Sequence, residues 1–512
     1  MKVTALGATA ALATLVTAES SLSCCGALAK HPQLKGKIYD AKSKEYDARL
    51  ATYYSANSAL PPTCMAMPSS TQDVSTIAKI ISEKQCLFGM RSGSHSAWRG
   101  ANSVDDGITI DFSYMNKTTY DIKTKTAKIQ PGSDWGHVYE ALNPYGVVAV
   151  GGRASIVGVG GFTTGGGYSF HSQKRGFACD AVANFEVVLA DGSIVNANTK
   201  ENPDLFKSLK GGSGNLGFIT RVDERMSILI SCSFCTLADQ PLGVENSNTL
   251  WGGFVFFDPK DSDSVFDAYI DFTEKMDDDP ASEIITSIQW NGTDRFMISV
   301  VSNVDTIPNP AIFKDYLSLP STSNTISTGE IADLIPQFTG PTPLGLYANW
   351  MAGQFSNDVR AMRFAEKKHA ETVEKMQAAA PGSEFNLLLQ FQPVTPLMAK
   401  HAEDAGGNVL GLTELTKDGP TIMWMIMCTV DTPENQEKIH PLTLEFRESI
   451  IAYGREIGAH KDYIYLNYAL GDQDVIASYG AENVKFLKKT AKRYDPHGVF
   501  QKLRRSGFKL PT

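Results

Sequence analysis

The chain has 512 residues, of which 42% are hydrophobic and 20% charged, and its formal net charge at pH 7 is −9. This length allows two or three domains with large cores, and the composition is that of a globular protein. The negative charge argues against nucleic acid or an anionic membrane as the main partner, and no apolar run after the N-terminus is long enough to predict a spanning helix.

The first 18 residues have the pattern of a signal peptide. Lys2 is the only charge ahead of a weakly apolar stretch, and Val16, Thr17 and Ala18 form a small-residue cleavage site before Glu19. A structural helix is the alternative, although the segment has no polar face. We expect a secreted protein, with which glycosylation sequons beginning at residues 116 and 291 are compatible.

The chain has eight cysteines. A secreted protein passes through an oxidising compartment, where cysteines can form disulfides. We expect most of them to form structural bridges, with Cys24 and Cys25 tying the N-terminal segment to Cys64 and Cys86. The pair at 232 and 235 could be a redox motif or half of a zinc site, but no matching Cys/His pair stands nearby, so we expect no metal.

The first half of the chain alternates short strands and helices. A helix over 72–85 has one apolar face, and Ser70 or Thr71 is available as its cap. Asp191 and Gly192 predict a hairpin between strands at 184–189 and 193–197. The other expected elements are strands at 86–90, 107–112, within 119–130 and at 147–150, and a helix at 134–142.

From about residue 230 to 455 the pattern changes to longer strands with helices between them. Asn291 and Gly292 join two strands, so part of this sheet is antiparallel, and the helices are expected on one face of it. The expected strands are 250–257, 284–290, 295–302, 344–355, 385–393 and 421–430, and the expected helices 263–276, 358–379 and 433–457. A last helix at about 480–493 stops at Asp495 and Pro496.

Two glycine-rich turns carry the strongest chemical signal. The first, Arg91–His95, contains a histidine; the second, Val157–Gly167, has six glycines in eleven residues. Glycine lets backbone N–H groups converge on an anion, and histidine can act as a nucleophile near neutral pH. Together they predict a phosphate-bearing cofactor held by backbone beside a histidine.

Three interpretations of these glycines compete. In a Rossmann fingerprint, Asp180 would be the acidic residue that follows the glycines by roughly twenty positions. That fingerprint also needs a helix that begins at the glycine motif, and the glycine density after Gly161 disfavours such a helix. A P-loop lacks the Gly-Lys-Ser/Thr sequence, and ordinary tight turns do not explain a third cluster at Gly211–Gly217. A non-Rossmann dinucleotide site built from several turns explains all three clusters.

An ordered series of motifs over the first 220 and last fifty residues resembles the motifs of a known family. The series resembles the berberine-bridge-enzyme-like, FAD-linked oxidases, whose cofactor domain is shared with vanillyl-alcohol oxidases, and is most similar to their secreted fungal members. The motifs are Pro61–Pro68 with Asp73 and Val74, Arg91–His95, Gly158–Gly167, Gly176–Val182, Val188–Gly192, Glu201–Phe206, Gly211–Gly217, Tyr465–Tyr468, and Tyr494–Pro496 with Val499 and Phe500. The middle matches only through Gly406–Gly411.

The resemblance implies one covalent bond to the flavin. His95 matches the histidine that these enzymes bond to the flavin 8α carbon, with Ser94 where they have glycine. Ala154 stands where many members have a second, cysteine attachment. Val157 matches a position that governs oxygen access, and a small residue there indicates an oxidase.

The remaining site residues are likewise implied by the resemblance. The catalytic base is expected to be Tyr465 or Tyr468, because the strand at 420–430 carries no carboxylate. His171, Trp350, Gln390 and Gln392 are further candidates for the pocket wall. The expected cofactor contacts are Arg91, Ser92, Gly93, Ser94, His95, Ser96, Val157, Gly158, Gly161, Gly165, Gly166, Ala181, Val182 and Asn467.

The sequence therefore predicts an α+β flavoprotein with a two-lobed FAD domain (55–228 and 464–512) and an antiparallel-sheet substrate domain covered by helices (229–463). The expected function is a secreted FAD oxidase that takes hydride from an alcohol or natural-product carbon and is reoxidised by O2 to give H2O2. A carbohydrate oxidase, a non-redox cyclase with FAD as scaffold and a cofactor-free binding protein are the alternatives. The oligomeric state stays open.

Overall fold

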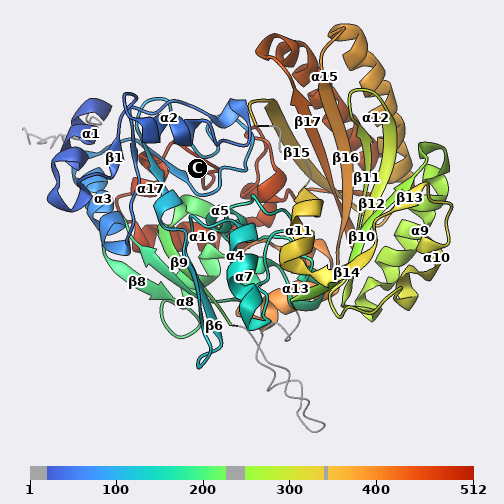
Figure 1. Cartoon of the computed structure of the whole chain (residues 1–512), viewed down its shortest axis with the longest axis horizontal. Helices are drawn as coiled ribbons and strands as arrows, with labels where there is room; N and C mark the ends of the chain where they lie inside the picture. The colour runs from blue at the N-terminus through green and yellow to red at the C-terminus, as the bar shows by residue number, and fades with distance from the viewer. Residues whose placement is uncertain (1–19, 226–247, 340–343) are drawn as a thin grey trace, which may run out of the picture.

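The computed structural model describes residues 20–225, 248–339 and 344–512 (Figure 1). Three sheets organise this part of the chain: a four-stranded and a five-stranded sheet from its first half, and a nine-stranded sheet from its second half. The expected signal peptide, the cysteine pair at 232 and 235, and the expected border at 228/229 all lie outside the described residues.

The first sheet has strand order β1–β2–β4–β3, in which β2, β4 and β3 run parallel. Helix α3 (Thr71–Lys84) connects β2 to β3, and the Ser70 side chain caps it by accepting from the Asp73 N–H at 3.2 Å. The apolar face predicted for this helix is buried. The strands are β1 (Ile38–Tyr39), β2 (Cys64–Ala66), β3 (Phe88–Arg91) and β4 (Ile108–Asp111).

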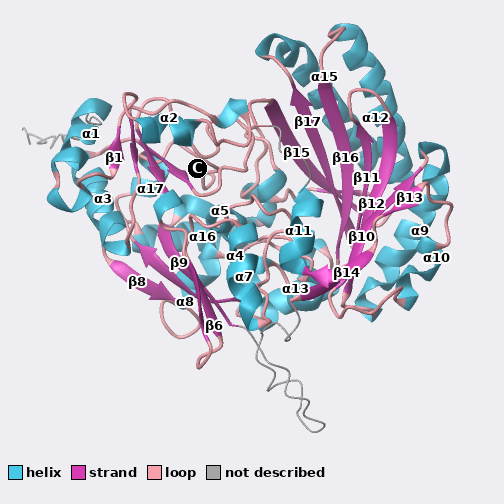
Figure 2. Cartoon of the chain, in the orientation of Figure 1, coloured by secondary structure: helices cyan, strands magenta, loops and turns pink. Residues whose placement is uncertain are grey.

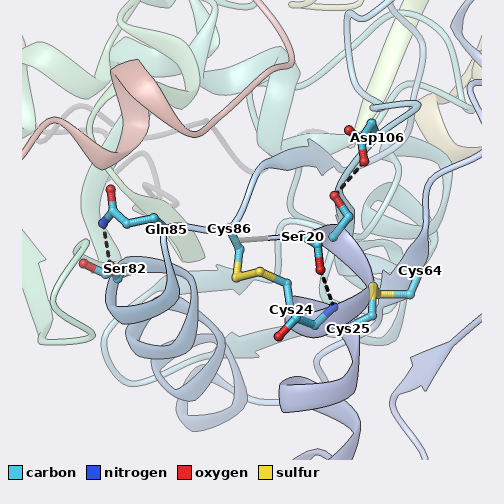
Figure 3. Close-up of a disulfide and its surroundings, with 10 residues drawn as sticks. Ser20, Cys24, Cys25, Cys64, Ser82, Gln85, Cys86 and Asp106 are labelled. Carbon is cyan, nitrogen blue, oxygen red and sulfur yellow. Dashed lines mark hydrogen bonds between the residues drawn. A yellow bond between two sulfur atoms is a disulfide. The ribbon is translucent and has the colours of Figure 1, made fainter. Parts of the chain in front are cut away.

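Two disulfides fasten helix α1 (Ser21–Lys30) to this sheet (Figure 3). Cys24 pairs with Cys86, just ahead of β3, and Cys25 pairs with Cys64, the first residue of β2. The partners expected for the two adjacent cysteines are confirmed. The expectation that most cysteines form bridges does not extend to residues 179 and 428, which are buried free thiols.

The second sheet has the antiparallel order β5–β6–β9–β7–β8. Strands β7 and β8 form the predicted hairpin about Asp191 and Gly192, with Gly192 at φ +79°. Helix α4 (Trp135–Leu142) is capped by Asp134. The strands are β5 (Thr118–Asp121), β6 (Thr126–Ile129), β7 (Val182–Val188), β8 (Ile194–Ala197) and β9 (Phe218–Arg225).

The third sheet is antiparallel throughout, with order β13–β10–β12–β11–β16–β17–β15–β18 and β14 paired to β10. Helices α9 (Ser262–Lys275), α12 (Val359–Ala379) and α15 (Pro433–Glu456) cover the face turned away from the first two sheets (Figure 2). The strands are β10 (Thr249–Phe257), β11 (Ser282–Trp290), β12 (Arg295–Asn303), β13 (Ser323–Asn324), β14 (Ser327–Glu330), β15 (Tyr347–Ser356), β16 (Phe385–Val394), β17 (Thr421–Val430) and β18 (His460–Lys461).

The remaining α-helices lie between the strands and after the last strand. They are α2 (Lys44–Leu50), α5 (Val159–Thr164), α6 (Ser172–Arg175), α7 (Ala178–Ala181), α8 (Pro203–Leu209), α10 (Lys314–Leu317), α11 (Ile331–Thr339), α13 (Pro396–Asp404), α14 (Leu412–Leu415), α16 (Ala481–Tyr494) and α17 (Val499–Lys502). Helix α16 is the last one expected from the sequence, and it ends at Tyr494, as predicted.

The expected strand at 147–150 is wrong. These four residues are buried, but they join no sheet, and the Val150 N–H donates to the Glu224 side chain at 3.2 Å. A short apolar run reports burial and does not by itself report strand pairing. The second glycine-rich turn also differs from expectation, since six of its residues form helix α5.

Candidate active site

The two glycine-rich turns touch each other through their backbones. A Cβ at Gly93 would lie 2.4 Å from the Gly158 nitrogen, and a Cβ at Gly158 would lie 2.2 Å from the Gly93 nitrogen. Ser92 reinforces the contact, because its hydroxyl donates to the Pro131 carbonyl at 2.5 Å and accepts from the Gly160 N–H at 3.2 Å. The turns therefore form one surface, and glycine is required at both points of contact.

Ser94 takes a left-handed conformation, with φ +57°, where the resembling family has glycine. Its hydroxyl donates to the Gly93 carbonyl at 2.6 Å and accepts from Arg91 Nη2 at 3.1 Å. Arg91 is itself buried over the Tyr53 ring and ion-paired with Asp111 at 3.4 Å. These contacts offset the cost of serine at this φ, so the substitution keeps the turn intact.

The half-buried imidazole of His95 lies in an aromatic setting at the end of the first turn. It stacks on Tyr54 with ring centroids 4.1 Å apart and meets Trp350 edge-on at 5.3 Å. Desolvation lowers the pKa of His95 to about 4, so the ring is neutral at physiological pH. A neutral imidazole has a free nitrogen lone pair and can act as a nucleophile.

A cavity of about 830 Å³ lies between the glycine-rich turns and the nine-stranded sheet. Alternate residues of the sheet face into it, as strand geometry requires, while the intervening ones pack under the helices. The strands contribute Phe254, Phe256, Ile285, Ser287, Gln289, Phe296, Ile298, Val300, Trp350, Asn386, Leu388, Gln390, Met425, Met427 and Thr429. Among the described residues that line this cavity there are arginines but no Asp or Glu.

The structure separates the two candidate tyrosines. The buried hydroxyl of Tyr465 accepts from the N–H groups of Gly167 and Tyr168 at 3.0 and 2.9 Å, and from Asn467 Nδ2 at 3.1 Å. Tyr465 thus fixes the end of the second glycine-rich turn, and burial raises its pKa. Tyr468 is half-buried, lines the cavity and packs against Trp350, with ring centroids 5.6 Å apart.

Arg153 is the site residue that the sequence did not reveal. Its Nη2 donates to Gln392 and, at 3.2 Å, to the Tyr468 hydroxyl, and its guanidinium lies 4.5 Å above the Tyr168 ring. Its Nη1 is buried without a hydrogen-bond partner, and no ion pair is found for it in the described chain. The only sequence signal is its place beside Ala154, at the entry to the second turn.

Most of the expected cofactor residues reach the cavity wall. Those that do are Arg91, Ser92, Gly93, Ser94, His95, Ser96, Val157, Gly158, Gly161 and Asn467. Gly165, Gly166, Ala181 and Val182 lie behind it. A Cβ at Gly165 would come within 2.1 Å of the Asn467 Oδ1, so this glycine admits the amide.

Of the four residues considered for the pocket wall, two line the cavity and two do not. Trp350 and Gln390 line the cavity. Gln392 is fully buried behind it and also donates to the Tyr468 hydroxyl, at 3.3 Å. His171 is buried away from the wall, and desolvation lowers its pKa to about 3.

These residues fit FAD. Backbone from two touching glycine-rich turns gives the close approach that a dinucleotide needs, and a wall with arginines and no carboxylate suits its phosphates. His95 and Ala154 line the same cavity. In the described residues no group of three or more His, Cys, Asp and Glu could hold a metal.

Comparison with known proteins agrees with this fit. Residues 62–198 match the FAD binding domain family model. The FAD-dependent monooxygenase sdcF of Emericella nidulans is 35% identical over 492 residues, covering 95% of this chain and 98% of the relative. Berberine bridge enzyme from Eschscholzia californica has the same fold at 15% identity (TM-score 0.71, 96% and 99% covered). So does glucooligosaccharide oxidase from Acremonium strictum, at 18% identity (TM-score 0.69, 96% and 100% covered).

The chain belongs to the berberine-bridge-enzyme-like family of FAD-binding enzymes. It is an FAD-linked oxidoreductase that acts on small molecules, with the two-lobed FAD domain and antiparallel-sheet domain expected from its sequence. None of the helices in the described ranges is long and apolar enough to cross a membrane.

Proposed function

We propose that this protein is a secreted oxidase that holds FAD through a single covalent bond to His95 and oxidises a small, largely apolar natural-product alcohol. The observation that carries the proposal is the meeting of His95 and the Arg153–Tyr468 pair on the walls of one cavity. The neutral imidazole supports the tether. Ala154 has no sulfur for a second bond, and Val157 leaves room for oxygen beside the second turn.

When bound, FAD supplies the acceptor for a hydride and, through O2, a route to hydrogen peroxide. Tyr468 takes the proton of the substrate hydroxyl. Its oxygen accepts from Arg153 Nη2 at 3.2 Å and from Gln392 Nε2 at 3.3 Å, and these two hydrogen bonds fix the position of the atom that receives the proton.

The sheet face of the cavity supports an apolar substrate. Phe254, Phe256, Phe296 and Phe338 are half-buried rings along one wall, and Phe254 and Phe338 lie 5.3 Å apart. Since no carboxylate lines the described wall, a cationic amine would have no charged partner. Side chains such as Gln289 and Gln390 add a limited number of polar groups that can orient a substrate.

A second candidate is oxygen insertion, because the fungal relative described above is named a monooxygenase. Labelled oxygen separates the two. Under 18O2 the oxidase gives labelled peroxide equal to the substrate consumed and an unlabelled product, whereas a monooxygenase gives a labelled product.

The experiment that tests the oxidase is anaerobic reduction of the flavin, followed by admission of air. A panel of aromatic and allylic alcohols, sugars and amines would be screened. The proposal expects an alcohol to bleach the flavin absorbance, and air to restore it with one peroxide per turnover. Bleaching by sugars alone would identify a carbohydrate oxidase, and turnover without bleaching or peroxide would identify a cyclase.

Secretion is the remaining part of the proposal. The two disulfides near the N-terminus support passage through an oxidising compartment, and the sequon residues Asn116 and Asn291 are exposed. N-terminal sequencing of protein recovered from the culture medium should begin at Glu19. Protein retained inside the cell with Met1 intact would contradict secretion.

A further inference from the structure

The C-terminal tail lies beside the strand that leads into the His95 turn. The Phe88 N–H in β3 donates to the Leu503 carbonyl at 3.0 Å, and the Arg505 N–H donates to the Phe88 carbonyl at 2.7 Å. The Ser506 hydroxyl accepts from the Met90 N–H at 3.0 Å. Because β3 continues into the first glycine-rich turn, the tail reaches the same cavity, and Arg504, Ser506, Gly507 and Phe508 line it.

Arg504 is a buried cation without a counter-charge. Its side chain is 2% exposed, and Nη2 donates to the Asn215 Oδ1 and the Phe508 carbonyl, both at 2.7 Å. Both acceptors are neutral, and no carboxylate of the described chain forms an ion pair with this guanidinium. Burial lowers the pKa of Arg504 to about 9. A charged group in such a setting is costly unless an anion pairs with it.

A second basic side chain, Lys509, lies next to Arg504. Lys509 donates to the Phe500 carbonyl at 2.9 Å and to the Arg504 carbonyl, and it too has no ion pair in the described chain. Desolvation, together with the nearby arginines at 504 and 505, lowers the pKa of Lys509 to about 6. Lys509 is therefore largely uncharged near pH 7, and the unpaired charge of Arg504 is what attracts an anion to this part of the cavity.

The Nη1 atom of Arg504 is the free part of this group. It lies against two glycines: a Cβ would come within 3.2 Å of it at Gly214 and within 2.9 Å at Gly507. No protein hydrogen bond to Nη1 is found in the described chain, and unlike Arg153 Nη1 it is not among the fully buried unpaired atoms. Since the residue lines the cavity, Nη1 is available to a ligand there.

We propose that Arg504 binds the diphosphate of the FAD through Nη1. Arg504, Ser506, Gly507 and Phe508 line the same cavity as His95, Trp350 and Tyr468, and the unpaired charge of Arg504 suits the charged half of the dinucleotide. A charge-assisted hydrogen bond contributes about 1.5–3 kcal/mol, or roughly 10- to 150-fold in affinity. No local motif pointed to this contact, because Arg504 lies in no glycine-rich turn.

The test uses the full chain with His95→Ala, so that flavin binding is reversible. The dissociation constants of FAD and riboflavin are measured by fluorescence quenching, with and without Arg504→Gln. We expect Arg504→Gln to weaken FAD at least 10-fold and riboflavin less than twofold, because riboflavin has no phosphate. Arg504→Lys should recover part of the loss, and Arg505→Gln, which removes an exposed neighbouring arginine, should leave both constants unchanged.

Equal weakening of FAD and riboflavin, or weakening of neither, would overturn the proposal. A second readout applies even if His95→Ala takes up no flavin: ADP should raise the thermal unfolding midpoint of His95→Ala, but not that of the double variant with Arg504→Gln. A shift by ADP that survives the loss of Arg504 would also overturn it. Failure of the unmodified protein to bind any flavin would instead contradict FAD binding itself, so the two failures are distinguishable.

Discussion

Replacing Gly93 by alanine should separate the two glycine-rich turns. The added methyl carbon would lie 2.4 Å from the Gly158 nitrogen and 2.5 Å from its Cα, whereas ordinary contacts begin at 3.4 Å. Backbone atoms cannot swing aside as a side chain can, so the turns must move apart by about 1 Å. Overpacking of this kind costs about 1–3 kcal/mol, and we expect the upper part of that range.

The assay measures flavin content and thermal unfolding of the same preparations. Gly93→Ala should lower the unfolding midpoint and strongly reduce bound flavin, because the cradle no longer has its shape. Gly161→Ala is the control for stability: it lies in the same second turn, but its methyl would meet no protein atom within 4 Å. We expect its unfolding midpoint to stay within about 1 °C of that of the unmodified protein.

A double-mutant cycle tests whether one contact is responsible. Gly158→Ala creates a steric clash at the same contact from the second turn, because its Cβ would lie 2.2 Å from the Gly93 nitrogen. Once the turns are apart, the second methyl costs little, so the double variant should lose clearly less than the sum of the two single losses. Additive losses, or normal flavin content in Gly93→Ala, would refute the reasoning.

Three further predictions concern the base, a buried acid and the disulfides. Tyr468→Phe should slow anaerobic flavin reduction by about 10²–10⁴-fold while leaving flavin content unchanged, and an unchanged rate in stopped-flow would exclude it as the base. Burial raises the pKa of Glu224 to about 8, so the folded state binds more protons than the unfolded state between about pH 4.5 and 8, and the free energy of unfolding falls as pH rises through this window. The total fall should be up to about 5 kcal/mol. Denaturant titrations of Glu224→Gln should show no such fall, and a fall that persists in this variant would contradict the assignment. Replacing Cys24 and Cys86 together by serine, with the Cys25–Cys64 bridge intact, should cost about 3 kcal/mol, measured as a lower chemical-denaturation midpoint; an unaltered midpoint would argue that the bridge adds no stability.

Much of this architecture could be predicted from local signals. The periodicity of 72–85 and the cap at Ser70 gave helix α3, and the Asp191–Gly192 and Asn291–Gly292 pairs gave two hairpins. Six of the nine strands of the large sheet were predicted to within a few residues, and the three short strands β13, β14 and β18 were not predicted. These features depend on nearby residues, which is why a single sequence reveals them.

The features that were missed depend on contacts across the fold. Val147–Val150 has a strand-like composition, yet its backbone bonds to a glutamate from β9. Arg153 meets Tyr468, 315 residues away, and Arg504 meets Asn215, 289 residues away. No local pattern marks an arginine as an active-site residue when its partners come from the other end of the chain.

The attachment of the flavin is the central claim, and a peptide map tests it most directly. The protein would be precipitated in acid, digested with protease, and its peptides separated with detection at 450 nm. One yellow peptide is predicted, containing His95 and heavier by the mass of the flavin, with none from a cysteine and none at all from the His95→Ala variant. Flavin that stays in the acid supernatant of the unmodified protein would contradict the account.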